Sequence, residues 1–198
     1  MIKRLFDLLI AVLALIILSV FFLFIAIAVK LSGPGPVFYI QRRVGLSGKE
    51  FTIYKFRTMH VNAEKAGLLT VGGRDKRITT IGYFLRKFKL DELPQLLNVI
   101  KGDMSLVGPR PEVKKYVDLY NASQREVLNV RPGITDYASM IYSNENELLA
   151  KTSDPEHEYI HTIMPAKLEL NLKYIREKNL IVDIKILAQT VAKILISN

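Results

Sequence analysis

One apolar run limits what this chain can fold into. It extends from Leu8 to Val29, and Ser19 is its one polar residue. At about 1.5 Å per residue, a helix of this length matches a hydrocarbon layer of roughly 30 Å. The sequence therefore predicts an N-terminal membrane helix. A cleaved signal peptide is the alternative, disfavoured because the run exceeds the usual length and no small-x-small cleavage site precedes Lys30.

Basic residues flank both ends of this run. Lys3 and Arg4 precede it, and a second basic group begins at Lys30. Because lysine and arginine favour the cytoplasmic side of a membrane helix, both ends prefer the same side. A single straight span cannot satisfy both ends, so a re-entrant helix that turns back within one leaflet is the second topology. Such a helix needs a polar break, and the Ser19 hydroxyl can bend a helix by bonding the carbonyl four residues back.

The segment "LSGPGPVF" marks a boundary, because its prolines and glycines end any helix. We expect a membrane-embedded segment over residues 1–31 and a membrane-associated domain over residues 32–198. The domain begins with "VFYIQRRV" and "EFTIYKFRTM", which are rich in β-branched and aromatic residues and predict a β-hairpin. The second strand segment contains Lys55 and Arg57, which either form a solvated basic face or contact a phosphate.

The rest of the chain favours helices. Helical spacing occurs from Glu112 to Val130, and in the segments "ITTIGYFLRKFKL", "HTIMPAKLELNLKYIREKN" and "LIVDIKILAQTVAKILIS". The first and last of these three segments combine an apolar stripe with basic residues, which suits a membrane surface. The predicted fold class is therefore α+β, mainly α, with amphipathic interfacial helices and one small β-hairpin.

Two adjacent acids, Asp91 and Glu92, open the segment "DELPQLLNVI". Asp91 is a suitable N-cap and Pro94 is tolerated in a first helical turn, so capping alone could explain the acids. The sequel "KGDMSLVGPRPE" favours a further role, because its glycines and prolines form a stiff turn that presents Arg110. An arginine fork suits a diphosphate. Carboxylates beside phosphates imply a divalent cation, so Asp91 and Glu92 are also predicted Mg²⁺ ligands.

Charge and composition narrow the partners. The net charge of +9 favours nucleic acid, anionic lipid or a phosphorylated substrate. The absence of cysteine excludes a disulfide framework and Cys-ligated zinc.

These segments together resemble the bacterial sugar transferases called monotopic phosphoglycosyl transferases. The resemblance covers nearly the whole chain, through "KRLFD", "GPVFYIQRRVG", "YKFRTM", "RITTIGYFLRKFKLDELPQLLNVIKGDMSLVGPRPE", "RPGIT" and "LIVDIKIL". It implies transfer of a sugar 1-phosphate from a UDP-sugar to undecaprenyl phosphate, with Mg²⁺ and with release of UMP, at the start of glycan assembly. It also implies a re-entrant helix and an active site on the cytoplasmic face of the inner membrane, with no nucleic-acid partner. A homodimer is compatible with this picture.

The resemblance also implies roles for single residues. Asp91 matches the nucleophile, which forms a covalent aspartyl-phosphosugar intermediate, and Glu92 matches its partner at the metal or acceptor. Arg110 of "GPRP" matches a contact to the nucleotide diphosphate, and Arg131 of "RPGIT" is a weaker match to a substrate contact. Members often have Ser-Pro at the break of the membrane helix, whereas Val20 follows the serine here.

Two other functions fit parts of the sequence. "HEYIH" matches H-E-x-x-H, in which His157 and His161 would bind zinc with Glu158 as the base of a membrane metalloprotease. Glu169 and Glu177 are the candidates for a third ligand. A non-enzymatic module that binds anionic membranes would explain the charge but leaves "DELPQ" and "GPRP" without a role.

Overall fold

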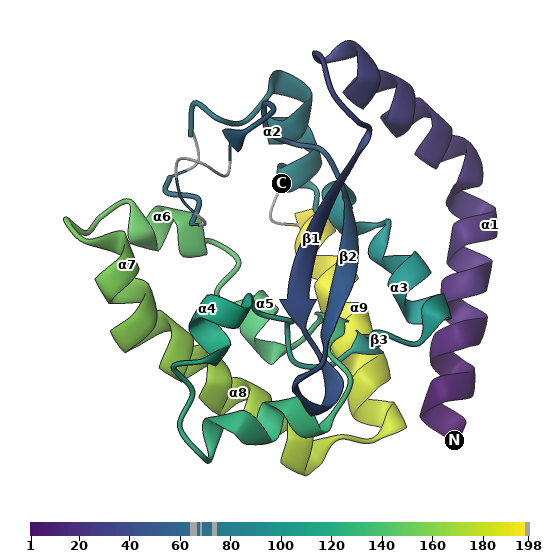
Figure 1. Cartoon of the computed structure of the whole chain (residues 1–198). Helices are drawn as coiled ribbons and strands as arrows, with labels where there is room; N and C mark the ends of the chain where they lie inside the picture. The colour runs from purple at the N-terminus through teal and green to yellow at the C-terminus, as the bar shows by residue number, and fades with distance from the viewer. Residues whose placement is uncertain (64–66, 68, 73–74, 197–198) are drawn as a thin grey trace.

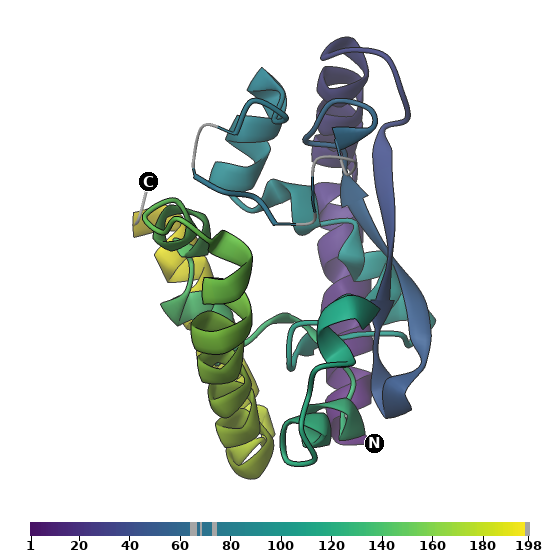
Figure 2. The same ribbon diagram turned by 60° about the vertical axis from the view of Figure 1, so that its left-hand side comes forward.

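The computed structural model describes residues 1–63, 67, 69–72 and 75–196, and it has the predicted fold class, α+β and mainly α (Figure 1). The elements, in chain order, are α1 (Ile2–Leu31), β1 (Phe38–Val44), η1 (Leu46–Gly48), β2 (Glu50–Phe56), α2 (Thr80–Lys87), η3 (Leu90–Glu92), α3 (Gln95–Lys101), β3 (Ser105–Val107), α4 (Lys114–Val117), η4 (Gln124–Asn129), β4 (Gly133–Thr135), α5 (Tyr137–Ile141), α6 (Glu145–Leu149), α7 (Pro155–Glu158), η5 (Tyr159–Ile163), α8 (Met164–Glu177) and α9 (Leu180–Ile196). Figure 2 shows α8 and α9 on the side of the molecule opposite α1.

The apolar helix α1 curves along one side of the domain (Figure 1). Among the described residues it is the one helix whose length and composition would allow it to cross a membrane. It runs from Ile2 to Leu31 without interruption, and the Ser19 hydroxyl donates to the carbonyl of Ile16, three residues back, at 2.8 Å. The expected bond to the carbonyl four residues back is therefore wrong, and Ser19 does not break the helix.

The N-terminal end of α1 is fastened to the domain by polar contacts. The buried Asp7 carboxylate accepts hydrogen bonds from the Ser105 hydroxyl at 2.7 Å and from the Leu106 amide at 3.3 Å. Lys3 forms an ion pair with buried Asp183, Nζ to Oδ2, at 2.5 Å. This end of α1 thus meets both β3 and α9.

The C-terminal end of α1 is fastened to the same domain by Arg57. The guanidinium donates to the carbonyls of Val29 and Gly33, each at 2.8 Å, and also to that of Pro34. Because the last carbonyls of a helix lack partners within the helix, the guanidinium satisfies part of that deficit. Both ends of α1 therefore contact one globular unit.

The predicted β-hairpin is confirmed. β1 and β2 pair antiparallel, from Phe38 opposite Phe56 to Val44 opposite Glu50. The turn contains Ser47, whose φ of 57° is uncommon outside glycine.

A second sheet was not predicted. The three-residue strands β3 and β4 pair in parallel, with Ser105 opposite Gly133 and Val107 opposite Thr135. At the crossing, a Cβ atom added to Gly133 would lie 2.1 Å from the Gly108 nitrogen, so only glycine fits there. This close approach fixes the start of the turn that carries Arg110.

The helices expected at 78–90 and in the last two segments are confirmed as α2, α8 and α9, but the single helix expected from Glu112 to Val130 is wrong. The chain forms the short α4 and then the 3₁₀ helix η4. Asn121 explains the break, because its side-chain oxygen accepts from the Gln124 amide at 2.9 Å and from the Ser123 hydroxyl at 3.0 Å. Such local bonds compete with helix continuation.

Candidate active site

Asp91 and Glu92 lie in η3, a single 3₁₀ turn between α2 and α3. The chain reverses at Lys89, whose φ of 56° is left-handed, and this ends α2 before the acids. The N-cap of α3 is Pro94, and no side chain caps that helix. The prediction that Asp91 caps a helix is therefore wrong, and its carboxylate is left for another use.

The two acids lie directly beside the membrane helix. Leu90 and Leu93, which flank them, pack against the core cluster that contains Ile25 and Val29 of α1. Both acids are buried. The turn that carries the acids is therefore anchored to the C-terminal half of α1.

Glu92 is held by two cations. Its carboxylate accepts from Lys55 at 2.8 Å and from both terminal nitrogens of Arg110, at 3.0 Å for Nη1 to Oε2. Burial alone would raise the pKa of Glu92, but the charges of Arg110 and Lys55 outweigh it and hold the pKa well below the usual range. Glu92 is thus ionised, and the structure brings both predicted cations to it.

Asp91 has the opposite environment. Within the described residues its carboxylate accepts no hydrogen bond and forms no ion pair. Burial and the neighbouring Glu92 charge raise the pKa of Asp91. A buried carboxylate without donors keeps its lone pairs free, which suits a nucleophile or a metal ligand.

The structure adds Arg86, which the sequence did not single out. Its guanidinium donates from Nε to the Thr58 hydroxyl at 2.8 Å and from Nη1 to the Thr70 hydroxyl at 3.1 Å. Burial lowers the pKa of Arg86, while the charge of Asp91 raises it. In the described part of the chain Arg86 forms no salt bridge, so it is a third cation near the acid pair, after Lys55 and Arg110. The helical pattern of α2 gave no sign of this, because it placed Arg86 only on the polar face.

Two predicted substrate contacts do not reach this cluster. Arg57 donates to the backbone at the end of α1, and Arg131 donates from Nε to the carbonyl of Gly102 at 2.9 Å. Both guanidiniums serve helix ends, at α1 and α3 respectively. The substrate-binding roles of Arg57 and Arg131 stay predictions that this arrangement does not favour.

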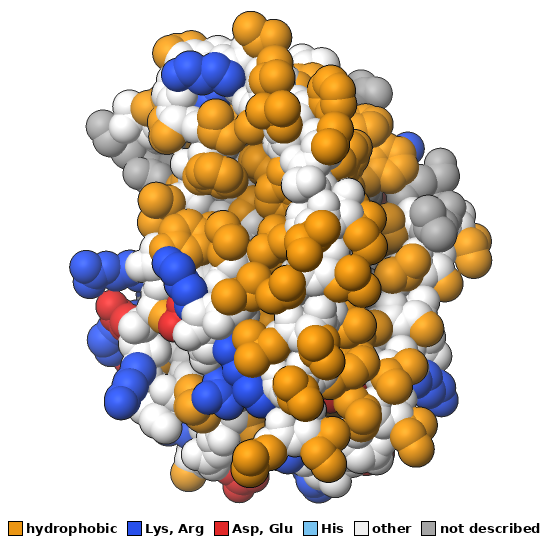
Figure 3. All heavy atoms as spheres, turned by 90° about the vertical axis from the view of Figure 1, so that its right-hand side faces the viewer, with side chains coloured by type: hydrophobic (Ala, Val, Ile, Leu, Met, Phe, Trp, Pro, Cys, Tyr) orange, Lys and Arg blue, Asp and Glu red, His pale blue; other side chains and the backbone are white. Residues whose placement is uncertain are grey.

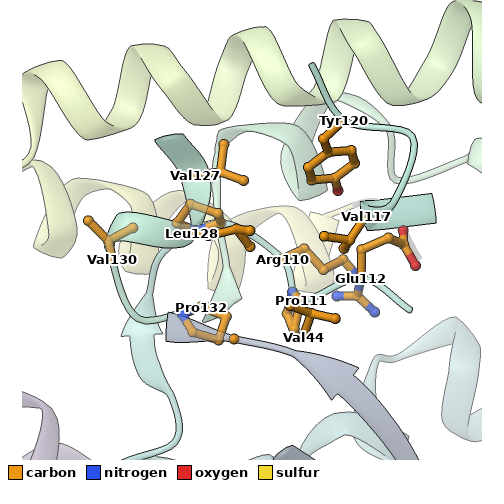
Figure 4. Close-up of a pocket in the computed structure, with 12 residues that line it drawn as sticks. Val44, Arg110, Pro111, Glu112, Val117, Tyr120, Val127, Leu128, Val130 and Pro132 are labelled. Atoms are coloured by element: carbon orange, nitrogen blue, oxygen red, sulfur yellow. The ribbon is translucent and has the colours of Figure 1, made fainter. Parts of the chain in front are cut away.

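The turn that carries Arg110 packs over apolar side chains. Figure 4 shows Arg110, Pro111 and Glu112 around a small cavity whose other walls include Val117 and Tyr120. The cavity measures about 10 Å³, so the turn rests on a nearly filled core. The turn thus packs on apolar side chains, and its Arg110 guanidinium contacts Glu92.

The predicted Mg²⁺ and the zinc of the alternative metalloprotease differ in fit. Among the described residues no group of three or more His, Asp or Glu could hold a metal ion, and the His157 and His161 rings pack on one another with centroids 4.3 Å apart. The zinc site therefore has no third ligand. Mg²⁺ commonly binds through one or two carboxylates and substrate phosphates. Asp91 fits this pattern, whereas the oxygens of Glu92 are taken by Lys55 and Arg110.

An apolar face adjoins the site. Figure 3 shows hydrophobic side chains covering most of the α1 side, with Lys and Arg around its margin and most of them at the lower left. On α1 itself the outward side chains are largely exposed, for example Leu13, Ile16 and Phe24 at 52%, 66% and 64%. So large an apolar surface marks a membrane or partner contact.

Comparison with known proteins shows the family. A profile described as "Bacterial sugar transferase" matches residues 1–197. The chain is 42% identical over 195 residues to the uncharacterized sugar transferase EpsL of Bacillus subtilis, covering 98% of this chain and 88% of that protein. It is 38% identical over 199 residues to the UDP-N-acetylgalactosamine-undecaprenyl-phosphate N-acetylgalactosaminephosphotransferase of Aeromonas hydrophila, covering 98% of this chain and 44% of that protein.

A third relative has the same kind of match. The chain is 38% identical over 197 residues to the UDP-glucose:undecaprenyl-phosphate glucose-1-phosphate transferase of Escherichia coli, covering 98% of this chain and 40% of that protein. The chain therefore spans most of EpsL but less than half the length of the other two relatives. With a family profile matched over nearly every residue, this chain belongs to the bacterial sugar transferase family.

Proposed function

We propose that this transferase moves a sugar 1-phosphate from a UDP-sugar to undecaprenyl phosphate, releasing UMP, through a covalent intermediate on Asp91. The observation that carries the proposal is the unlike pair of acids: Asp91 without donors, and Glu92 held by Lys55 and Arg110. The substrates named for the Aeromonas and Escherichia relatives support the donor and acceptor classes. The product would be the first lipid-linked sugar of a glycan.

The proposed reaction has two displacements. In the first, an Asp91 oxygen attacks the β-phosphorus of the UDP-sugar, the bond from that phosphorus to the UMP oxygen breaks, and UMP leaves. In the second, a phosphate oxygen of the lipid attacks the same phosphorus, and the Asp91 carboxylate is regenerated. One site thus serves a soluble donor and a membrane acceptor in turn.

Glu92 acts in this scheme by holding the cations before the donor arrives. Lys55 and Arg110 can exchange their contacts with Glu92 for contacts with the diphosphate, where the arginine fork binds two oxygens at once. Arg86 supplies a further cation at the same acid pair. The donor would therefore enter a site whose positive charges are already in position.

Magnesium would be held by Asp91 together with the donor phosphates, and by Glu92 once its cations have moved to the diphosphate. When bound, the ion would neutralise the charge that builds up on the leaving UMP. Removal of divalent ions with a chelator is expected to stop transfer.

We further propose that the protein lies at the cytoplasmic face of the inner membrane, with α1 re-entrant. Ser19 does not break α1, so the helix would turn back by its curvature (Figure 1). The support is that both ends of α1 contact one globular unit, through Asp7 and Arg57, while its outward face is apolar. The Asp91 site would then open at the membrane surface, where a lipid phosphate could reach it.

The decisive experiment measures UMP release. The purified protein is incubated with undecaprenyl phosphate, Mg²⁺ and a panel of UDP-sugars. Release from at least one donor, dependent on the lipid, supports the proposed function. No release from any donor would contradict it.

The raised pKa of Asp91 predicts an acid limb at unusually high pH. The carboxyl must be ionised to attack, so intermediate formation should fall as the pH drops through a value above the ordinary 3.8 of aspartate. The charge of Lys55 lowers the pKa of Asp91, so Lys55→Met should move this limb to still higher pH. The pH profile of UMP release before lipid is added measures both limbs. A limb at or below the ordinary value would contradict the assignment.

Arg110→Lys tests the fork. Lysine keeps the charge but loses the planar pair of donors, so we expect a fall in kcat/KM for the UDP-sugar of about tenfold, roughly 1.4 kcal/mol. Arg131→Lys is the matched control, because its guanidinium bonds a backbone carbonyl away from the acids. Equal kinetics for the Arg110 variant and the wild type would make Arg110 a structural residue.

A further inference from the structure

Glu112, the last residue of "GPRPE", is a half-buried carboxylate that the proposed reaction does not use. Its Oε1 accepts from Arg43 at 2.8 Å and from the Val113 amide at 2.7 Å, and its Oε2 accepts from the Tyr159 hydroxyl. Its carbonyl accepts from the Val44 amide at 2.9 Å. Glu112 thus ties the β-hairpin to the helical layer that carries Tyr159.

Tyr159 reaches Glu112 because of an unusual turn. It begins η5, a π-helical turn between α7 and α8, and it is 3% exposed. Its ring packs against that of Tyr116, with centroids 4.8 Å apart. Short π-helical turns are often found at functional sites. In "HEYIH" the inward residue is therefore the tyrosine, while His157 and His161 are exposed.

Near neutral pH the Glu112 carboxylate is ionised and the Tyr159 hydroxyl is neutral. Burial would raise the pKa of Glu112, but Arg43 and the Tyr159 hydroxyl outweigh it and lower the pKa. Burial and the Glu112 charge raise the pKa of Tyr159 well above its usual value, so the hydroxyl stays a donor. The contact between the two side chains is thus a fixed one between an ionised acceptor and a neutral donor.

Three further hydrogen bonds hold the turn from 109 to 112 on both sides. Arg43 donates to the Pro111 carbonyl at 3.3 Å, and the Arg110 amide donates to the Asp136 carboxylate at 3.3 Å. The Pro109 carbonyl accepts from the Gly133 amide at 2.9 Å. The Arg110 guanidinium leaves this turn toward Glu92, so its position depends on how firmly the turn is held.

We propose that Tyr159 is a positioning residue: through Glu112 it fixes the turn and holds the Arg110 fork where the donor diphosphate binds. This inference rests on the proposed function. It gives a role to the buried tyrosine of "HEYIH". It also links η5, far from Asp91 in sequence, to donor binding.

Tyr159→Phe removes only the hydroxyl. We expect KM for the UDP-sugar, and the dissociation constant for UDP, to rise on the order of tenfold while kcat changes little. Tyr120→Phe is the matched control: Tyr120 belongs to the same core cluster, and its hydroxyl makes no hydrogen bond within the described residues. The control should leave both constants unchanged. Calorimetric titration with UDP measures affinity without turnover.

A double-mutant cycle separates positioning from a general loss of packing. In an Arg110→Lys background the fork is already lost, so Tyr159→Phe should add little to the UDP dissociation constant. Effects that multiply in the double variant would contradict the proposal. Arg43→Lys, which loses donors to Gln41 and Pro111 but keeps its charge, should behave in the cycle as Tyr159→Phe does. If Tyr159→Phe lowers the thermal unfolding midpoint, Arg43→Lys takes its place in the double-mutant cycle.

The outcomes also separate this inference from the proposed function. A wild type that transfers sugar phosphate, with equal UDP affinity in the Tyr159→Phe variant, would contradict the positioning role alone. A wild type that binds UDP but transfers from no donor would contradict the proposed function, and the UDP cycle would still test Tyr159. A wild type that does not bind UDP would contradict both.

Discussion

Asp91→Asn should abolish UMP release and any covalent adduct. An amide cannot form the acyl phosphate that the two-displacement reaction requires. Within the described residues the Asp91 carboxylate accepts no hydrogen bond, so the substitution removes no structural contact. The fold should be retained, because asparagine has nearly the same shape and the position has no capping duty. We expect activity to fall by at least about 10⁴-fold, as when other enzymes lose a covalent nucleophile.

Mass spectrometry of protein quenched with a UDP-sugar in the absence of lipid provides the direct measurement. A sugar-phosphate mass on the peptide that contains Asp91 is expected for the wild type and absent from Asp91→Asn. Glu92→Gln is the matched control: it also exchanges a carboxylate for an amide in η3, and it should slow turnover yet still allow some adduct. An active Asp91→Asn variant would rule out the covalent mechanism.

The acid pair shows what the sequence could and could not predict about the site. The resemblance and the stiff turn indicated Asp91, Glu92 and Arg110 together, and the structure brings all three into one cluster. The roles of the two acids could not be separated from spacing alone. The two acids differ because Lys55 from the hairpin and Arg110 from the turn both contact Glu92. These contacts link residues that lie far apart in the chain.

Lys55 and Arg57 show the limit of strand periodicity. The sequence predicts a strand that contains both, and it leaves open whether they form a solvated basic face or contact a phosphate. β2 ends at Phe56, however, and Arg57 then turns toward the end of α1, while Lys55 points to Glu92. The position of the strand end, which the sequence pattern does not fix, thus separates the contacts of two residues that lie two apart.

The fold shows a similar division. The hairpin is rich in β-branched and aromatic residues and the long helices carry helical patterns, so their signals are local. β3 and β4 are only three residues long, too short for a period, and their pairing depends on the close approach of Gly108 and Gly133. Arg86 was missed for a related reason: helix spacing placed it only on the polar face of α2. The left-handed Lys89 follows that helix, and the acids after it lie close enough for the charge of Asp91 to act on Arg86.

The second large effect is expected at the start of α1. Asp7→Leu removes the acceptor of the Ser105 hydroxyl and the Leu106 amide, leaving two buried donors unpaired at about 1–3 kcal/mol each. It also extends the apolar run toward the N-terminus, which favours a straight span. We expect the N-terminus to cross the membrane in a large fraction of molecules, and transfer to fall by about tenfold or more because α1 no longer lies along the site.

Thiol labelling measures this change, because the chain contains no cysteine of its own. A cysteine at Ile2, which is 75% exposed, should be shielded from an impermeant reagent in intact cells and become labelled when Asp7→Leu is added. A cysteine at Lys49 should stay shielded in both backgrounds. Ser19→Leu is the control for added hydrophobicity, since its hydroxyl bonds only within α1, and it should leave labelling unchanged. If the Ile2 cysteine is labelled without any Asp7 substitution, α1 spans the membrane and the buried Asp7 contacts cannot be what holds its two ends together.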